Sequence, residues 1–246
     1  MGNKSKKNKG HKHGAIVKPK RRVSLDTKLH SIYSMEDLKT VCCRQCTCCR
    51  VACPTMKKCE ATSIIDKIWS SWNKDDKKKL LATCVKYFFS DSLIKPCPLL
   101  RGSECRVYDD RPIACRIYGL WPETSWKKRV EMFSKSTGLQ KHQLPLNFQC
   151  TNVKRAKGLP DLTDEQIQLM FDALDGLDMV MGATDLQVKS SWNFRTIHDW
   201  IIWTFWGEDF LVQWTSLLLS MNAEQRASVV EAFLQQVDKM DIGPRK

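Results

Sequence analysis

Two cysteine-rich stretches decide how this chain folds: CCRQCTCCRVACP at residues 42–54 and CPLLRGSECRVYDDRPIACR at residues 97–116. The 246-residue chain contains 12 cysteines, and seven of them lie between Cys42 and Cys59. This density is too high for ordinary core thiols. In a reducing compartment, such clusters indicate metal or redox chemistry rather than structural disulfides.

The first stretch fits two known metal-binding patterns. The C-x2-C-x2-C-x3-C-P run of bacterial ferredoxins matches at Cys43, Cys46, Cys49 and Cys53-Pro54. The C-x3-C-x2-C triad of radical-SAM enzymes matches from Cys42 onward. Both matches are weak, because the ferredoxin run has no second copy and the chain shows few strands for a barrel. What remains is a set of short loops that aim three or more thiolates at one metal, about 2.3 Å from each sulfur.

Several arginines lie next to or near the cysteines. They are Arg44, Arg50, Arg106, Arg111 and Arg116. Clustered thiolates repel one another and are stabilised by nearby positive charge. These arginines therefore either offset the charge of a thiolate site or occupy ordinary surface positions, and the sequence leaves both interpretations open.

The second stretch resembles the YkgJ-like cysteine-cluster proteins, described as zinc- or iron-chelating domains of the CxxCxxCC type. It matches their pattern at Cys97-Pro98-Leu99-Leu100, at Cys105-Arg106-Val107-Tyr108 and at Arg111-Pro112-Ile113-Ala114-Cys115-Arg116. The first stretch matches at Cys43, Cys46 and Cys49 but departs at Arg50, where the family has a cysteine. The resemblance covers roughly residues 42–118.

This resemblance implies metal binding through six thiolates: Cys43, Cys46, Cys49, Cys97, Cys105 and Cys115. The cofactor expected is an iron–sulfur cluster, which the ending Cys53-Pro54 favours, or else zinc or iron. Six thiolates exceed the four that one zinc ion or one cubane cluster needs. The sequence leaves open which of four neighbours replaces the family ligand at Arg50: Cys42, Cys48, Cys53 or Cys59.

Three other functions are compatible with the sequence. The flagellin lysine N-methylases carry a related cysteine cluster. This suggests a SAM-using protein lysine methylase as a possible function, although the chain has no glycine-rich cofactor loop. The basic residues 1–24 hold nine of the 40 Lys and Arg and no acid, so they are either a nucleic-acid-binding arm or a solubilising tail. The arm contains no interleaved aromatic residues for base stacking. A purely structural zinc ion is the fourth hypothesis.

The expected fold is mainly α, with an irregular cysteine-rich metal-binding core that has short strands at most and is packed with helices. We expect a disordered basic arm at residues 1–24, a cysteine-cluster metal-binding domain at 36–150, and a helical C-terminal region at 160–240 packed on the same core. A very short strand is expected at Val107-Tyr108, with helix after Ile113.

Apolar periodicity predicts the helices. Two are expected in residues 62–92, with Asp75-Asp76 opening the second and Cys84 buried in its apolar face. Thr163 and Gln166 form a capping box for a helix that Gly182 ends. One or two helices should cover about 194–220, Asn222 should cap the last one, and the tryptophans between 192 and 214 should mostly be core.

The sequence shows no secretory signal, because no apolar stretch follows the basic N-terminus. Its longest apolar run, Trp200–Trp206, is far shorter than the roughly 18 residues needed to span a bilayer. We therefore expect a cytoplasmic protein with no membrane partner.

Overall fold

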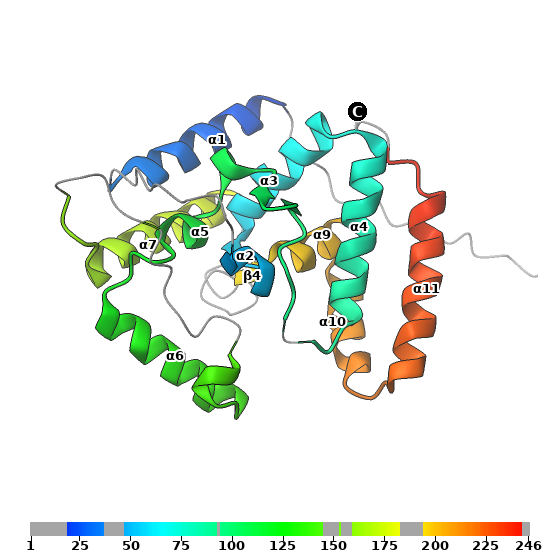
Figure 1. Ribbon diagram of the computed structural model, residues 1–246. Coiled ribbons are helices and arrows are strands. Elements are labelled where there is room, and N and C mark those ends of the chain that lie inside the picture. Colours follow the sequence, from blue (N-terminus) through cyan, green and yellow to red (C-terminus); the bar gives the residue numbers. More distant parts are fainter. Residues whose placement is uncertain are drawn as a thin grey trace, which may run out of the picture.

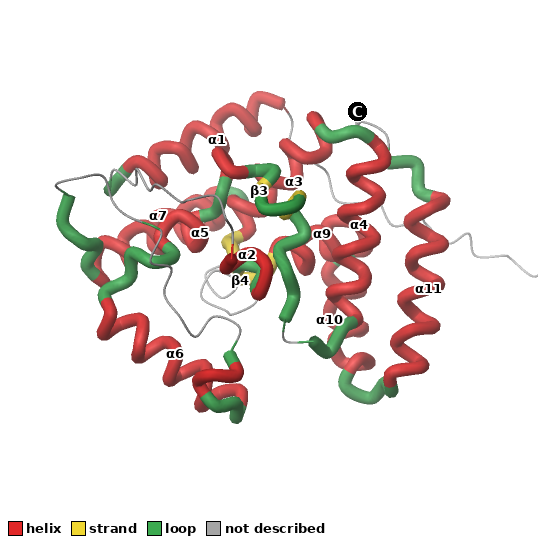
Figure 2. The backbone as a smooth tube through the Cα atoms, viewed as in Figure 1, coloured by secondary structure: helices red, strands yellow, loops and turns green. Residues whose placement is uncertain are grey.

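The computed structural model describes residues 19–36, 47–92, 94–144, 153, 159–182 and 194–242. Within these ranges the protein is mainly helical and contains two short two-stranded ribbons, which confirms the predicted fold class. Two groups of helices lie on either side of a middle zone, where loops and short strands run (Figures 1 and 2). Residues 1–18 of the predicted basic arm lie outside the described residues.

The first helical group forms a bundle on the right of Figure 1. It consists of α4 (Lys74–Phe89), α9 (Ile197–Trp206), α10 (Glu208–Leu218) and α11 (Ala223–Lys239), against which α3 (Lys58–Ser71) packs. Its core contains the predicted apolar faces, including Ile64, Ile68 and Leu81. Trp200 and Cys84 are also buried there, as the sequence predicted.

The second helical group has its own core, formed by α1 (Pro19–Ser34), α5 (Ile113–Ile117) and α7 (Asp164–Val180) with one face of α3. The helix α1 begins at Pro19, so residues 19–24, which we predicted as the end of the arm, are helical. The helix α6 (Glu123–Thr137) is attached to this side and buries none of its residues. A short turn η2 (Lys141–Gln143) follows it.

Two ribbons cross the middle zone. The strand β1 (Thr55–Lys57) pairs antiparallel with β4 (Phe194–Thr196), and β2 (Leu100–Arg101) pairs antiparallel with β3 (Glu104–Cys105). The strand predicted at Val107-Tyr108 is wrong, because the pairing ends at Cys105. The carbonyl of Val107 instead accepts a turn hydrogen bond from the backbone N–H of Asp110, which closes the 3-10 turn η1 (Tyr108–Asp110).

The predicted helix ends are confirmed by their side-chain caps. Thr163 and Gln166 form the reciprocal capping box of α7, and Asn222 caps α11. Gly182 follows α7 with a φ of 94°, a left-handed conformation that glycine adopts without strain. None of the described helices is long and apolar enough to cross a bilayer.

Candidate metal centre

Four of the six predicted ligands lie in the described part of the chain. Cys49 is on the short helix α2 (Thr47–Val51), Cys97 is in the loop after α4, Cys105 ends β3, and Cys115 is on α5. Cys43 and Cys46 lie outside the described residues, as do Cys42 and Cys150. The ligands that can be located therefore come from four separate elements.

These four cysteines and Cys48 line one partly enclosed cavity of about 70 Å³. This volume is several times the roughly 10–15 Å³ that a single buried water requires. Most of the remaining wall is apolar: Ala52, Pro54, Met56, Leu99, Val107, Pro112, Ala114 and Val153. Met56, Leu99 and Val107 belong to the core of the bundle and Val153 to the second core, so the cavity lies where the two cores meet.

The sulfur atoms of Cys48 and Cys49 lie 4.0 Å apart. Two sulfurs bound to one tetrahedral zinc at 2.3 Å would be about 3.8 Å apart, so this pair has nearly the spacing of two ligands. Among the described residues, no group of three or more His, Cys, Asp or Glu side chains is arranged to hold a metal ion. The thiols therefore share a cavity without meeting at a single point.

A backbone hydrogen bond joins the two cysteine stretches. The N–H of Cys97 donates to the carbonyl oxygen of Cys49 at 2.7 Å. The thiol of Cys53 approaches that of Cys97, and this contact, together with burial, raises the pKa of Cys97 well above its usual value. A sixth thiol thus stands directly beside the cavity.

The thiols of the cavity differ in acidity. Burial raises the pKa of Cys115 well above its usual value, and the neighbouring charges of Cys97 and Cys105 act in the same direction. The Cys49 thiol stabilises the thiolate of Cys48, which lowers the pKa of Cys48 to about 7, whereas the pKa of Cys49 itself is raised. One anionic sulfur in this pair is therefore accessible near neutral pH.

The predicted arginines separate into different roles. Arg111 is buried, lines the cavity, and lowers the pKa of both Cys48 and Cys115 by its charge. Its Nε donates to the carbonyl of Tyr108 at 3.0 Å, and its guanidinium lies 3.7 Å from the centre of the Tyr108 ring. Arg50 is exposed, and Arg44 lies outside the described residues. Arg111 is thus the arginine placed to offset thiolate charge.

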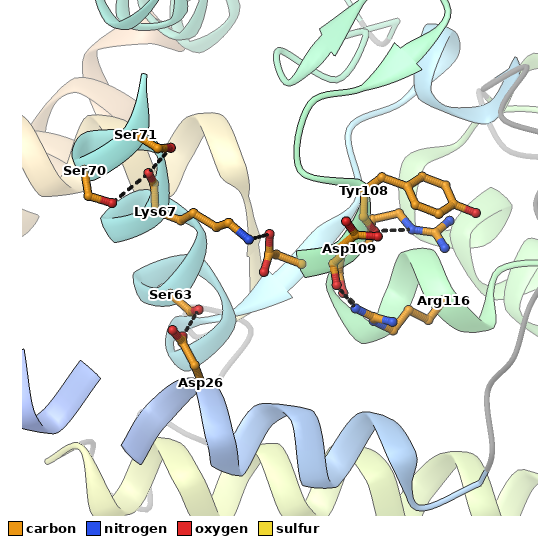
Figure 3. Close-up of polar contacts among 10 residues, drawn as sticks. Asp26, Ser63, Lys67, Ser70, Ser71, Tyr108, Asp109 and Arg116 are labelled. Carbon is orange, nitrogen blue, oxygen red and sulfur yellow. Dashed lines mark hydrogen bonds and ion pairs between the residues drawn. The ribbon is translucent and has the colours of Figure 1, made fainter. Parts of the chain in front are cut away.

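The segment that carries Arg111 and Cys115 is held in place by polar contacts, which Figure 3 shows. Arg116 donates from Nε to the carbonyl of Arg111 at 2.7 Å and from a terminal nitrogen to the carbonyl of Asp109. Lys67 on α3 forms an ion pair with Asp110. The turn is therefore fixed both internally and to α3.

Glu60 ties this segment to the rest of the fold, and no pattern in the sequence pointed to it. The carboxylate is fully buried and accepts hydrogen bonds from the Tyr33 hydroxyl at 2.9 Å and from the backbone N–H of Ile113 at 2.6 Å. It also accepts from the N–H of Lys57 at 3.0 Å. Burial raises the pKa of Glu60. One side chain thereby joins α1, the start of α3 and the start of α5.

Glu60 escaped notice because its capping box has no Ser or Thr at the N-cap. Lys57 occupies that position, three residues before Glu60. The usual sequence signal of a capping box is Ser or Thr followed three residues later by Glu or Gln. The contact with Ile113, 53 residues away, has no local signal at all.

The remaining described cysteines do not line the cavity. Cys59 faces α7, where its thiol contacts the carbonyl of Leu174 at 3.8 Å and its N–H donates to the buried carboxylate of Asp178 at 2.6 Å. Cys84 is fully buried in the core of the bundle. Of the cysteines predicted as possible substitutes for a ligand at Arg50, Cys48 lines the cavity and Cys53 lies beside it.

Comparison of the chain with protein-family models, with curated proteins and with solved structures finds no match in any of the three.

Proposed function

We propose that this protein binds a metal centre through the thiolates of its two cysteine stretches, and that the centre is an iron–sulfur cluster. The observation that carries this proposal is the convergence of Cys48, Cys49, Cys97, Cys105 and Cys115 on one cavity. Four separate elements supply them. Packing alone gives no reason for five polar, oxidisable side chains to share one apolar enclosure.

The surroundings of the cavity favour a cluster over a single zinc ion. Five lining thiols, with Cys53 adjacent, exceed the four that a closed zinc site uses. The apolar wall limits access of water, and Arg111 supplies positive charge, two properties that adjust the potential of iron–sulfur centres. The sequence Cys53-Pro54 is also the ending of the ferredoxin run.

Metal binding would draw the thiols closer together than they lie in the structure. Binding requires that protonated thiols such as Cys97 and Cys115 lose their protons, so the affinity should fall steeply as the pH falls. The free energy of binding would then also stabilise the fold around the cavity.

Metal analysis of anaerobically purified protein, together with its visible absorption spectrum, tests the proposal. We expect iron and acid-labile sulfide in stoichiometric amounts and a brown chromophore. Cys115→Ser and Cys97→Ser should abolish both. Cys84→Ser, which changes a buried thiol outside the cavity, is the matched control and should keep them.

Other results separate the hypotheses. A colourless protein with stoichiometric zinc that is lost in Cys115→Ser would overturn the cluster and keep thiolate metal binding. Absence of any metal, or equal metal content in Cys115→Ser and Cys84→Ser, would overturn both. The same measurement on Cys43→Ser and Cys46→Ser tests the two predicted ligands that lie outside the described residues.

A further inference from the structure

A second hollow lies on the other side of Cys105. Two adjoining open grooves, of about 570 and 270 Å³, share Trp72, Arg101 and Arg106 in their walls. Cys105 lines the larger groove and also the cysteine cavity. Cys105 therefore stands in the wall between the candidate metal centre and an open surface site.

We call this surface the basic groove and define it by Trp72, Lys79, Arg101 and Arg106. Trp72 follows the last residue of α3, Lys79 is on α4, and the two arginines flank the tight turn of the β2–β3 ribbon. Four positions spread over 35 residues of sequence thus meet at one place.

Arg106 is fixed in position before any ligand arrives. Its terminal nitrogen donates to Asp76 at 2.7 Å, and its guanidinium carbon lies 3.4 Å from the centre of the Trp72 ring. Its backbone N–H donates to the carbonyl of Leu99 at 3.0 Å. A guanidinium held in this way keeps other N–H donors for a ligand and loses little entropy when one binds.

The basic groove carries more positive than negative charge. Asp76 and Glu104 are the two carboxylates among the described lining residues. The hydrogen bond from Arg106 lowers the pKa of Asp76, and the charges of Arg101 and Lys79 act in the same direction. Within the described part of the chain, neither Arg101 nor Lys79 forms an ion pair. The described lining residues therefore include three cations and two carboxylates.

We propose that the basic groove binds a small molecule bearing a phosphate or carboxylate group, with Arg101, Lys79 and Arg106 as the anion contacts. Guanidinium groups match both oxyanions in shape and charge. The volume of the larger groove falls in the range of small-molecule sites, and the exposed flank of the half-buried Trp72 offers an apolar contact.

A molecule bound there would lie against Cys105. The site goes beyond metal binding and does not depend on it, because all of its contacts are made by protein side chains. If the cysteine cavity holds a cluster, Cys105 would be the ligand through which the bound anion and the cluster meet.

Calorimetric titration of the full-length protein with pyrophosphate and, separately, with citrate tests the proposal. We expect saturable, salt-sensitive binding of at least one of them, and the stronger ligand identifies the phosphate or the carboxylate class.

Arg101→Gln and Lys79→Gln should each weaken binding about fivefold, the scale of one exposed charge contact. Glu104→Gln, which removes an acid from the rim, should strengthen it. Lys86→Gln is the matched control, because it removes an exposed lysine of the same helix outside the groove.

A second readout locates the ligand next to Cys105 and needs no metal. In the metal-free protein, the bound anion should slow alkylation of Cys105 several-fold and leave that of Cys48 unchanged. Failure of both anions to bind, or equal weakening by Lys86→Gln and Arg101→Gln, would overturn the proposal. Because the alkylation is measured on metal-free protein, its outcome does not depend on the metal centre.

Discussion

The aromatic bundle and the cysteine region of this protein are built in opposite ways. In the bundle, α4 and α11 have 16 and 17 residues, and their faces meet in a cluster of aromatic rings. In the cysteine region, α2 and α5 have five residues each and β3 has two. The first region has long elements and an apolar core, whereas the second has short elements around a cavity lined by thiols.

This difference in element length indicates that the two regions depend on different interactions. Helices shorter than about 12 residues are marginal in water, so α2 and α5 need tertiary contacts to persist. Some of these contacts are the polar ones of Glu60, Arg111 and Arg116. The buried side chains of Ile113 and Ile117 add apolar contacts to α5. In our proposal the metal centre supplies further contacts. The bundle needs nothing beyond its own packing.

The largest effect should follow removal of the metal from the purified protein. The binding free energy of thiolate centres is of the order of 10 kcal/mol, and much of it stabilises the surrounding fold. We expect the amides of α2 and α5 to lose hydrogen-exchange protection when a chelator removes the metal. Those of α4 and α11 should change little.

Hydrogen exchange followed by mass spectrometry resolves the two regions in one sample. The Cys115→Ser variant should show the loss of protection without chelator, and Cys84→Ser should not. Equal loss across the bundle and the cysteine region would show that the two regions unfold as one cooperative unit.

The next largest effect should come from the bundle itself. Phe233 lies in the aromatic cluster, with its ring between 5.3 and 5.7 Å from those of Phe89, Trp206, Phe210 and Trp214. Phe233→Ala should lower the free energy of unfolding by about 3–5 kcal/mol. Metal content per folded molecule should stay unchanged, because the ring is remote from the cysteine cavity in sequence and does not line it.

Denaturant unfolding with metal analysis of the folded fraction checks this prediction. Phe233→Leu keeps an apolar side chain and should cost less than the alanine variant. Loss of metal from folded Phe233→Ala protein would contradict the separation of the two regions.

The sequence predicted the bundle well because its information is local. The apolar spacing of Ile64, Ile68 and Leu81 marks the buried faces directly, and Asn222 marks where the last helix begins. The error at Val107-Tyr108 arose because these apolar residues form part of a turn and not a hydrogen-bonded β-strand. Only Val107 of the pair is buried, and two adjacent apolar residues look the same in sequence in either structure.

The sequence predicted less of the cysteine region because its contacts are long-range. Spacing within each stretch indicates thiols that share a site, but the contact between Cys49 and Cys97 joins residues 48 positions apart. From the sequence, Arg111 could be proposed to offset thiolate charge, but a surface position was equally compatible. The role of Glu60 depends on where the whole fold places α5. Local patterns contain no information about such placements.

A smaller effect is expected at the link between the two regions, Glu60. Glu60→Gln keeps one accepting oxygen and places an NH2 group where the second oxygen accepted a hydrogen bond. It should lower the free energy of unfolding by about 1–3 kcal/mol, the cost of leaving a buried donor without its partner. Because the N-terminus of α5 is then held less firmly, metal affinity should also fall.

Thermal unfolding and competition with a chromogenic chelator measure the two consequences. Glu231→Gln, an exposed change on α11, is the control and should alter neither. If Glu60→Gln lowers stability but leaves metal affinity untouched, Glu60 supports the fold without positioning Cys115.

The smallest effect concerns the acidity of one thiol in the metal-free protein. The pKa of Cys48 is lowered to about 7 from an ordinary value of 9.0, so its thiolate forms as the pH rises through 7. Alkylation of Cys48 should therefore accelerate with a midpoint near pH 7, as followed by peptide mass spectrometry. Cys115, whose pKa is raised by burial, should stay unmodified in that range.

Arg111→Gln should move the midpoint of Cys48 upward, because it removes a charge that favours the thiolate. Arg50→Gln removes an exposed charge from the same stretch and should leave the midpoint in place. A midpoint near pH 9 would mean that the cavity does not lower the pKa of Cys48. Equal shifts in both variants would mean that Arg111 has no special effect on it.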